Sequence, residues 1–91
     1  MNIELKDPSH GPVYAQVREQ VEKLIRSGQL PNGETLESPA VLAQKLSVDR
    51  GEIQRAYFEL EHAGVILKES GKDFLGKPKT TYRVKSVNSN Q

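Results

Sequence analysis

Apolar residues recur at helical spacing in three stretches of the chain. These stretches run from about Pro12 to Ser27, from about Pro39 to Leu46, and from Arg50 to Ala63. Within each stretch the apolar positions return every three or four residues, which places them on one face of a helix. After Gly64 the pattern becomes extended and then alternating, as in a half-buried strand, most clearly over residues 80–85. The pattern predicts three helices followed by a two-stranded hairpin, a mainly α fold.

The second and third predicted helices form a helix-turn-helix. Asp49 is a good N-cap for the third helix, and Glu52 three residues later completes a predicted capping box. Gly64 supplies the left-handed residue that ends this helix. Only Ser47 and Val48 separate Asp49 from the second helix, a connection of the length that joins the two helices of a helix-turn-helix.

One compact core is predicted for this chain. The stripes of the helices and the first strand supply it: Val17, Val21, Leu24, Ile25, Leu42, Leu46, Ile53, Ala56, Leu60 and Ile66. The pair Ile3 and Leu5 is compatible with a brief strand, and the hairpin is expected to have a long polar tip over residues 70–79. We expect residues 1–86 to form a single domain and residues 87–91 to be a frayed polar tail.

Composition narrows the class of protein. A chain of 91 residues with 35% hydrophobic and 5% aromatic residues buries only somewhat more than ~60% of its unfolded surface, so a deep enzyme cleft is not expected. The absence of cysteine excludes disulfides and thiolate metal sites and fits a cytoplasmic location. The first twelve residues have no apolar signal segment, and no run is long enough to span a membrane.

Charge is unevenly distributed along the chain, although the net charge is only +1. Residues 1–66 carry seven Lys or Arg against ten Asp or Glu, whereas residues 67–91 carry six against two. The cations are therefore concentrated after the third helix, where a surface for a polyanion is favoured.

Two groups of side chains are candidates for contact with double-stranded DNA. On the third helix, Arg50 and Gln54 match the major-groove edges of guanine and adenine, and Arg55 suits a phosphate. The alternative is an ordinary solvated face, with Arg55 paired to Glu52 or Glu59. On the hairpin tip, Lys72, Lys77 and Lys79 suit phosphates, and the alternative is a merely exposed loop.

Other chemistry has little support in the sequence. Residues 71–78 imitate a nucleotide-binding loop, but Pro78 stands where a Mg²⁺-binding hydroxyl is needed, so no nucleotide is expected. His10 and His62 lack clustered ligands, so we expect no metal and no cofactor. No catalytic group can be assigned, and the sequence does not favour an enzyme.

The chain resembles the N-terminal winged-helix domain of the GntR family of bacterial transcription regulators, most closely its short-tailed branch. The resemblance covers roughly residues 7–69. The matching positions are Pro12, Tyr14, Gln16, Ile25, Gly28, Leu30, Pro31, Gly33, Leu36, Leu42, Ala43, Arg50, Ala56, Leu60, Glu61 and Gly64.

The resemblance implies a winged helix-turn-helix that binds operator DNA as a dimer. The third helix would lie in the major groove, and the hairpin wing would lie near the minor groove. Ser38 and Arg50 keep the family's residue types at the starts of the second and third helices, so the resemblance implies that both contact DNA. The family usually carries an effector or dimerisation domain after the wing, and we expect this chain to lack one.

The sequence departs from the family pattern at the helix starts. Ala40 and Gln54 stand where the family has arginine, and Asp49 and Glu52 are acids where the family has hydroxyl residues. The alternative function is therefore a degenerate winged helix that acts as a protein-interaction or dimerisation module without DNA. Its partner would be a second copy or a separate regulator chain, bound through the hairpin edge or through an exposed Phe58. Of the two possibilities for Phe58, we expect packing within the chain, on Ile3 or Leu5, and not an exposed contact.

Overall fold

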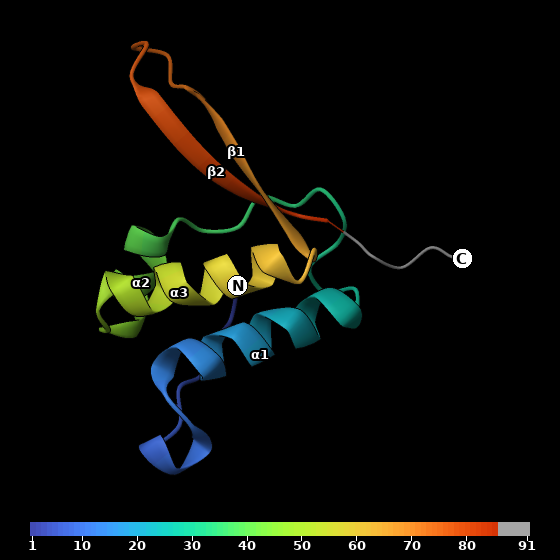
Figure 1. Ribbon diagram of the computed structural model, residues 1–91, viewed down its shortest axis with the longest axis vertical. Helices are drawn as coiled ribbons and strands as arrows, with labels where there is room; N and C mark the ends of the chain where they lie inside the picture. Colours follow the sequence, from blue (N-terminus) through green and yellow to red (C-terminus); the bar gives the residue numbers. More distant parts are fainter. Residues whose placement is uncertain (86–91) are drawn as a thin grey trace.

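Three helices support a two-stranded antiparallel hairpin that projects from them, as the computed structural model shows (Figure 1). The structure describes residues 1–85. The elements in chain order are the 3₁₀ turn η1 (Pro8–His10), α1 (Val13–Arg26), α2 (Pro39–Leu46), α3 (Arg50–His62), β1 (Ile66–Lys72) and β2 (Pro78–Val84). This arrangement is a winged helix-turn-helix, as predicted. The predicted tail over residues 87–91 lies outside the described residues.

The helices begin and end where local signals place them. The bounds of α2 agree with the prediction, and its N-cap Ser38 accepts a hydrogen bond from the Val41 amide at 3.2 Å. Helix α1 begins one residue later than predicted, because Pro12 is its N-cap. Gly64 has a φ of 80°, the left-handed conformation expected after α3.

The predicted capping box of α3 is wrong. The Asp49 side chain makes no cap hydrogen bond. The Glu52 carboxylate instead accepts a hydrogen bond at 3.1 Å from the backbone amide of Tyr14, in the first turn of α1. That amide has no partner within its own helix, and the packing of α1 against α3 brings it within reach of Glu52. One helix therefore caps another.

The core lies where the three helices meet the base of the hairpin. Seven of the ten predicted core residues are buried, including Val17, Ile53 and Leu60, whereas Leu24, Ile25 and Leu46 are only partly buried at its margin. The core also contains residues that helical periodicity did not identify. These are Ile3, Leu30, Leu36, Val65 and Val84, whereas Ala43 and Tyr57, which are also buried, lie on the apolar helix faces that the periodicity predicted.

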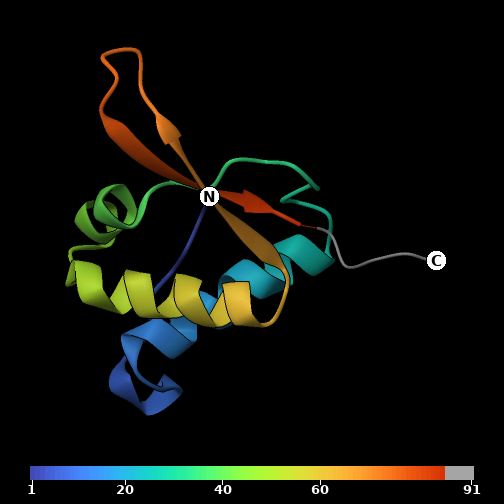
Figure 2. The same ribbon diagram turned by 45° about the horizontal axis from the view of Figure 1, so that its top comes forward.

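The hairpin has a shorter tip than predicted. Strands β1 and β2 pair continuously from Ile66↔Val84 to Lys72↔Pro78, so only residues 73–77 form the tip. Glycine and lysine within residues 70–79 suggested a loop, but the antiparallel ladder includes half of this segment. The result is a long, narrow ribbon that stands clear of the helices (Figure 2).

Two segments without predicted pairing are held by hydrogen bonds. Residues 33–36 run beside β2, with amides of Gly33 and Leu36 donating to the carbonyls of Val84 and Tyr82 at 2.8 and 2.7 Å. At the N-terminus, the suggested strand is absent from residues 1–7. The buried Gln16 side chain instead accepts from the Lys6 amide at 2.7 Å and donates to the Gly11 carbonyl at 2.8 Å.

Candidate nucleic-acid interface

A groove opens between the start of α2, the N-terminal half of α3 and one face of the hairpin. Its lining includes the N-cap of α2, one amide and two cations among smaller and aromatic side chains: Ser38, Pro39, Ala40, Arg50, Gln54, Lys68, Thr80 and Tyr82. Three of the seven residues that the sequence suggested for DNA contact are among them, namely Ser38, Arg50 and Gln54. The groove contains two cations and no acidic residue.

The turn between α2 and α3 sets the position of Arg50 and Gln54. Ser47 adopts the left-handed conformation at φ 58°, and the Val48 amide donates to the Ala43 carbonyl at 3.0 Å. Val48 packs against the core beneath this turn. Because the turn is short and anchored, α3 begins directly beside α2, with its first turn at the groove.

Tyr57 is a buried residue that connects the elements on either side of the groove. Its ring is fully buried in α3, and its hydroxyl donates to the Glu37 carbonyl, just before α2, at 2.7 Å. Burial raises the pKa of the Tyr57 phenol, so the hydroxyl stays a donor. The ring also meets Tyr82 of β2 edge to face, with centroids 4.9 Å apart. One side chain thus links α3 to α2 and to the hairpin.

The strand register decides which hairpin side chains face the groove. Lys68 pairs with Tyr82 and Ser70 pairs with Thr80, and side chains of paired residues lie on the same face of the ribbon. Lys72 is in the same alternating series as Lys68, so it lies on the groove face. Lys68 was missed in the sequence because nothing local distinguishes it from a solvent-facing lysine.

The opposite face of the hairpin has its own charges. Lys79 pairs with Gly71 and belongs to the series that includes Arg83, whose guanidinium donates to Glu69 at 2.8 Å. Lys79 therefore lies on the face of the hairpin that is turned away from the groove, whereas Lys72 lies on the groove face. Lys77 lies in the tip. All three predicted hairpin lysines are exposed, but the structure does not bring them to the α3 residues.

Arg50 and Gln54 are presented to solvent, and the acid between them is turned away. Both side chains are exposed, and within residues 1–85 Arg50 makes no ion pair. The Glu52 carboxylate is directed to α1, where it caps Tyr14. Glu52 therefore has a structural task, and neither Glu52 nor Asp49, the two acids that depart from the family pattern, is among the groove residues.

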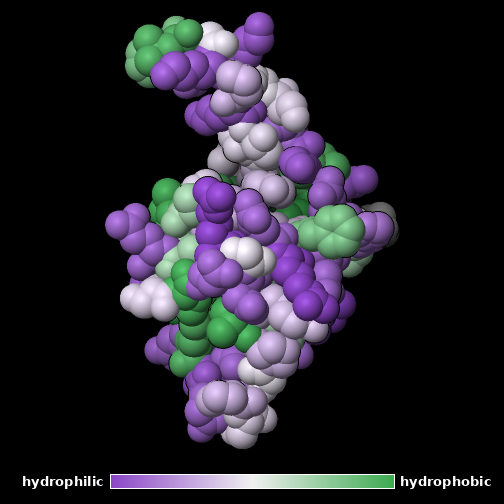
Figure 3. All heavy atoms as spheres, turned by 60° about the vertical axis from the view of Figure 1, so that its left-hand side comes forward, coloured by the Kyte–Doolittle hydropathy of each residue, from purple (hydrophilic) through white to green (hydrophobic). Residues whose placement is uncertain are grey.

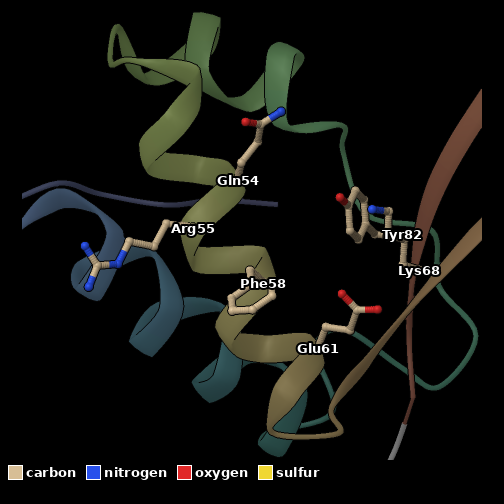
Figure 4. A pocket seen from close by; sticks show the side chains of 6 residues that line it. All are labelled: Gln54, Arg55, Phe58, Glu61, Lys68 and Tyr82. Carbon is tan, nitrogen blue, oxygen red and sulfur yellow. The ribbon is translucent and has the colours of Figure 1, made fainter.

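Arg55 lies against α1. This position favours the alternative in which Arg55 pairs with an acid of its own helix over a contact with phosphate. Its guanidinium carbon lies 3.8 Å from the centroid of the Tyr14 ring, and its Nε is 3.5 Å from a Glu59 carboxylate oxygen. Glu59 also pairs with Arg18 of α1. Figure 4 shows Arg55 pointing away from the hairpin, whereas Gln54 points to the side where Tyr82 and Lys68 lie.

The C-terminal half of α3 differs in character from the groove. Glu61 lies there on the side of the hairpin, and Phe58 lies beside it (Figure 4). Phe58 is 58% exposed and contacts the His62 ring edge to face, with centroids 4.5 Å apart. The expectation that Phe58 packs on Ile3 or Leu5 is therefore wrong, because it is not part of the core.

The described residues hold neither a cluster of metal ligands nor a helix suited to crossing a membrane. Among residues 1–85, no group of three or more His, Cys, Asp or Glu could hold a metal ion. In the same residues no helix is both long and apolar enough to cross a membrane.

Comparison with protein families gives a match over most of the chain. The model of the family described as bacterial regulatory proteins, gntR family, matches residues 13–75. The transcriptional repressor NagR of Bacillus subtilis is 28% identical over 90 residues, which are 98% of this chain and 36% of NagR. The chain thus spans about a third of the length of this relative.

Solved structures share the fold. YtrA from Sulfolobus acidocaldarius, a GntR-family transcription factor, aligns with a TM-score of 0.74 and 31% identity over 96% of this chain and 81% of that chain. The DNA-binding domain of AraR in complex with operator ORX1 aligns with a TM-score of 0.60 over 86% of this chain and 93% of that chain, at 22% identity. At that identity the second likeness shows the fold alone.

Proposed function

The chain belongs to the gntR family of bacterial regulatory proteins, and we propose that it is a DNA-binding winged-helix domain that recognises operator sequences in transcription regulation. The observation that carries the proposal is the groove, which joins Arg50 and Gln54 of α3 to Ser38 and Lys68 and contains no acid. In this arrangement the N-terminal half of α3 enters the major groove of double-stranded DNA.

Four of the groove residues contact DNA in this proposal. Arg50 extends from the first turn of α3 and donates two hydrogen bonds to the O6 and N7 atoms of a guanine. Gln54 lies one turn later on the same face and pairs through its amide with an adenine edge. Ser38 donates its hydroxyl proton to a phosphate while its oxygen caps α2, and Lys68 neutralises a phosphate on the hairpin side.

Lys72, Lys77 and Lys79 extend the cationic surface along the hairpin. They contact backbone phosphates beyond the α3 footprint, and these contacts position the protein without reading sequence. We do not assign Arg55 the phosphate contact suggested for it, since Tyr14 and Glu59 occupy its guanidinium. It steadies α3 against α1 instead.

A single copy has little electrostatic attraction for DNA, because its net charge is only +1. Useful affinity therefore calls for two copies on a two-fold symmetric site, whose phosphate contacts add. Phe58 favours a second candidate function, since this large apolar side chain is half exposed beside the groove. In that alternative the domain is a protein-interaction module without DNA, and Phe58 is its contact.

Selection of bound sequences from a random duplex pool at low salt tests DNA recognition. We expect one sequence class to be enriched, with affinity that falls steeply as salt rises. Sedimentation of the protein with the selected duplex gives the number of copies bound. If no sequence is enriched at any salt concentration, DNA recognition is wrong and the interaction module replaces it.

Three variants then separate base reading from phosphate contact. Arg50→Ala should weaken binding by roughly 1 to 3 kcal/mol and relax one base position. Lys77→Ala should weaken all sequences alike and lower the salt slope by about one. Lys23→Ala removes an equal charge from the exposed face of α1 and is the matched control, for which no change in selectivity or salt slope is expected.

A further inference from the structure

The most exposed large apolar side chains of residues 1–85 lie together at the tip of the hairpin. Phe74 is 94% exposed and Leu75 is 66% exposed. Figure 3 shows the apolar tip at the end of the projecting ribbon, with hydrophilic residues around it. Neither side chain packs against the core, which lies at the far end of the hairpin.

The tip is an ordered turn that holds these two side chains outward. The Gly76 amide donates to the Asp73 carbonyl at 2.9 Å, and the Asp73 amide donates to the Lys77 carbonyl at 2.9 Å. The Asp73 carboxylate accepts from the amides of Leu75 and Lys77 at 2.9 and 3.0 Å. Gly76 has a φ of 80°, as in three-residue hairpin loops that end on a left-handed glycine.

The charge around the tip indicates a polyanionic partner with an apolar interior. Lys72 and Lys77 flank the apolar pair, and Lys79 follows, whereas the only acid nearby is Asp73. The Asp73 carboxylate is already occupied by two backbone amides. Cations on both sides of an exposed phenyl ring are complementary to a nucleic-acid duplex, in which negatively charged phosphates surround a stack of apolar bases.

The length of the hairpin brings the tip to the right place on the same duplex. Lys68 lines the groove beside α3, and Phe74 lies six residues further along the ribbon, which corresponds to about 20 Å of extended chain. Half a turn of DNA is about 17 Å. With α3 in the major groove, the tip therefore reaches the neighbouring minor groove.

We propose that Phe74 and Leu75 form a wedge that enters the minor groove beside the α3 footprint and partly unstacks one base step, so that the duplex bends. This inference rests on the proposed function, because the helix places the tip. The step that opens is one that deforms easily, a pyrimidine–purine step such as TA or CA. The tip thereby adds sequence preference at a position where no hydrogen bond reads a base.

A stacking probe in the selected duplex tests the wedge. The base analogue 2-aminopurine, whose fluorescence rises on unstacking, is placed at successive positions beyond the α3 footprint. With the unaltered protein we expect a rise of about twofold or more at one step, together with a bend seen by energy transfer between the duplex ends. Phe74→Ala should abolish the rise and the bend and weaken binding about tenfold, the scale of one lost aromatic stacking contact.

Matched variants identify the cause of any change. Leu67→Ala removes a 43% exposed apolar side chain from the base of the same hairpin and should leave fluorescence, bend and affinity unchanged. Lys77→Ala should lower the salt slope but keep the fluorescence rise. Because Phe74 is almost fully exposed, Phe74→Ala should melt like the unaltered protein.

The outcomes separate this inference from the function on which it rests. If a duplex is selected and bound but no position brightens, or if Phe74→Ala binds and bends it like the unaltered protein, the wedge is wrong while DNA recognition stands. If Phe74→Ala instead lowers self-association in sedimentation and leaves the probe signal intact, the tip is a contact between copies and the wedge is again overturned. If no duplex is selected, both fall.

Discussion

Glu52→Ala should destabilise the protein although it removes an acid from the DNA-facing helix. The carboxylate caps the first turn of α1 through the Tyr14 amide at 3.1 Å, and loss of such a cap costs typically about 1 kcal/mol. Glu52 also lies in the first turn of α3, where a negative charge contributes a further ~0.3–1 kcal/mol. The expected loss of unfolding free energy is therefore about 1 to 2 kcal/mol.

Urea denaturation measures this loss. For a small domain it corresponds to a midpoint lower by about 1 M. Glu61→Ala is the matched control, since it removes the same charge from the exposed surface of the same helix and should change stability by less than about 0.5 kcal/mol. Glu52→Gln keeps an oxygen acceptor and should recover part of the loss.

One result would refute the capping role. If Glu52→Ala unfolds at the same urea concentration as Glu61→Ala, the carboxylate does not stabilise the start of α1. Glu52 would then be a free acid beside Arg50, and its removal should strengthen DNA binding at low salt more than Glu61→Ala does.

Two further predictions concern the core and the contact between α1 and α3. Leu60 is 1% exposed, so Leu60→Ala should lower the free energy of unfolding by roughly 2 to 5 kcal/mol in urea, and an unchanged midpoint would contradict its place in the core. The hydrogen bond from Arg18 holds the pKa of Glu59 below its usual range, so this pair stabilises the protein above the unfolded carboxyl pKa and loses that effect as pH falls through the lowered folded value. Glu59→Gln should flatten this acid limb of the stability–pH curve, and an unchanged limb would show that the pair does not contribute.

Local signals account for the parts of the fold that the sequence predicted. Ser38 followed by Pro39 starts α2 within its own turn, and Gly64 ends α3 through its own backbone conformation. The pairing of residues 33–36 with β2 is different, because it joins segments about 50 residues apart, as in the hydrogen bond from Arg83 to the Gly33 carbonyl. The hairpin tip was overestimated because Gly71 lies within a strand whose pairing no local signal marks.

The residues of the candidate site also differ in whether local sequence signals identify them. Arg50 and Gln54 were found because an exposed face of one helix can be read from its own periodicity. Lys68 requires the strand register, and the positions of Arg55 and Glu52 require knowledge of how α1 packs on α3. Side chains whose task depends on a neighbouring element are therefore the ones that sequence reasoning missed or misassigned.

The central claim is that the groove between α2, α3 and the hairpin is the surface that binds DNA. An NMR titration of the isotope-labelled protein with the selected duplex tests it most directly, because each backbone amide reports its own environment. We expect the largest shift changes at Ser38, Arg50, Gln54, Lys68 and Thr80, whereas Lys23 and Gln20 on α1 should stay unchanged. Changes centred on Phe58 and His62, with none at Arg50 and Lys68, would contradict it.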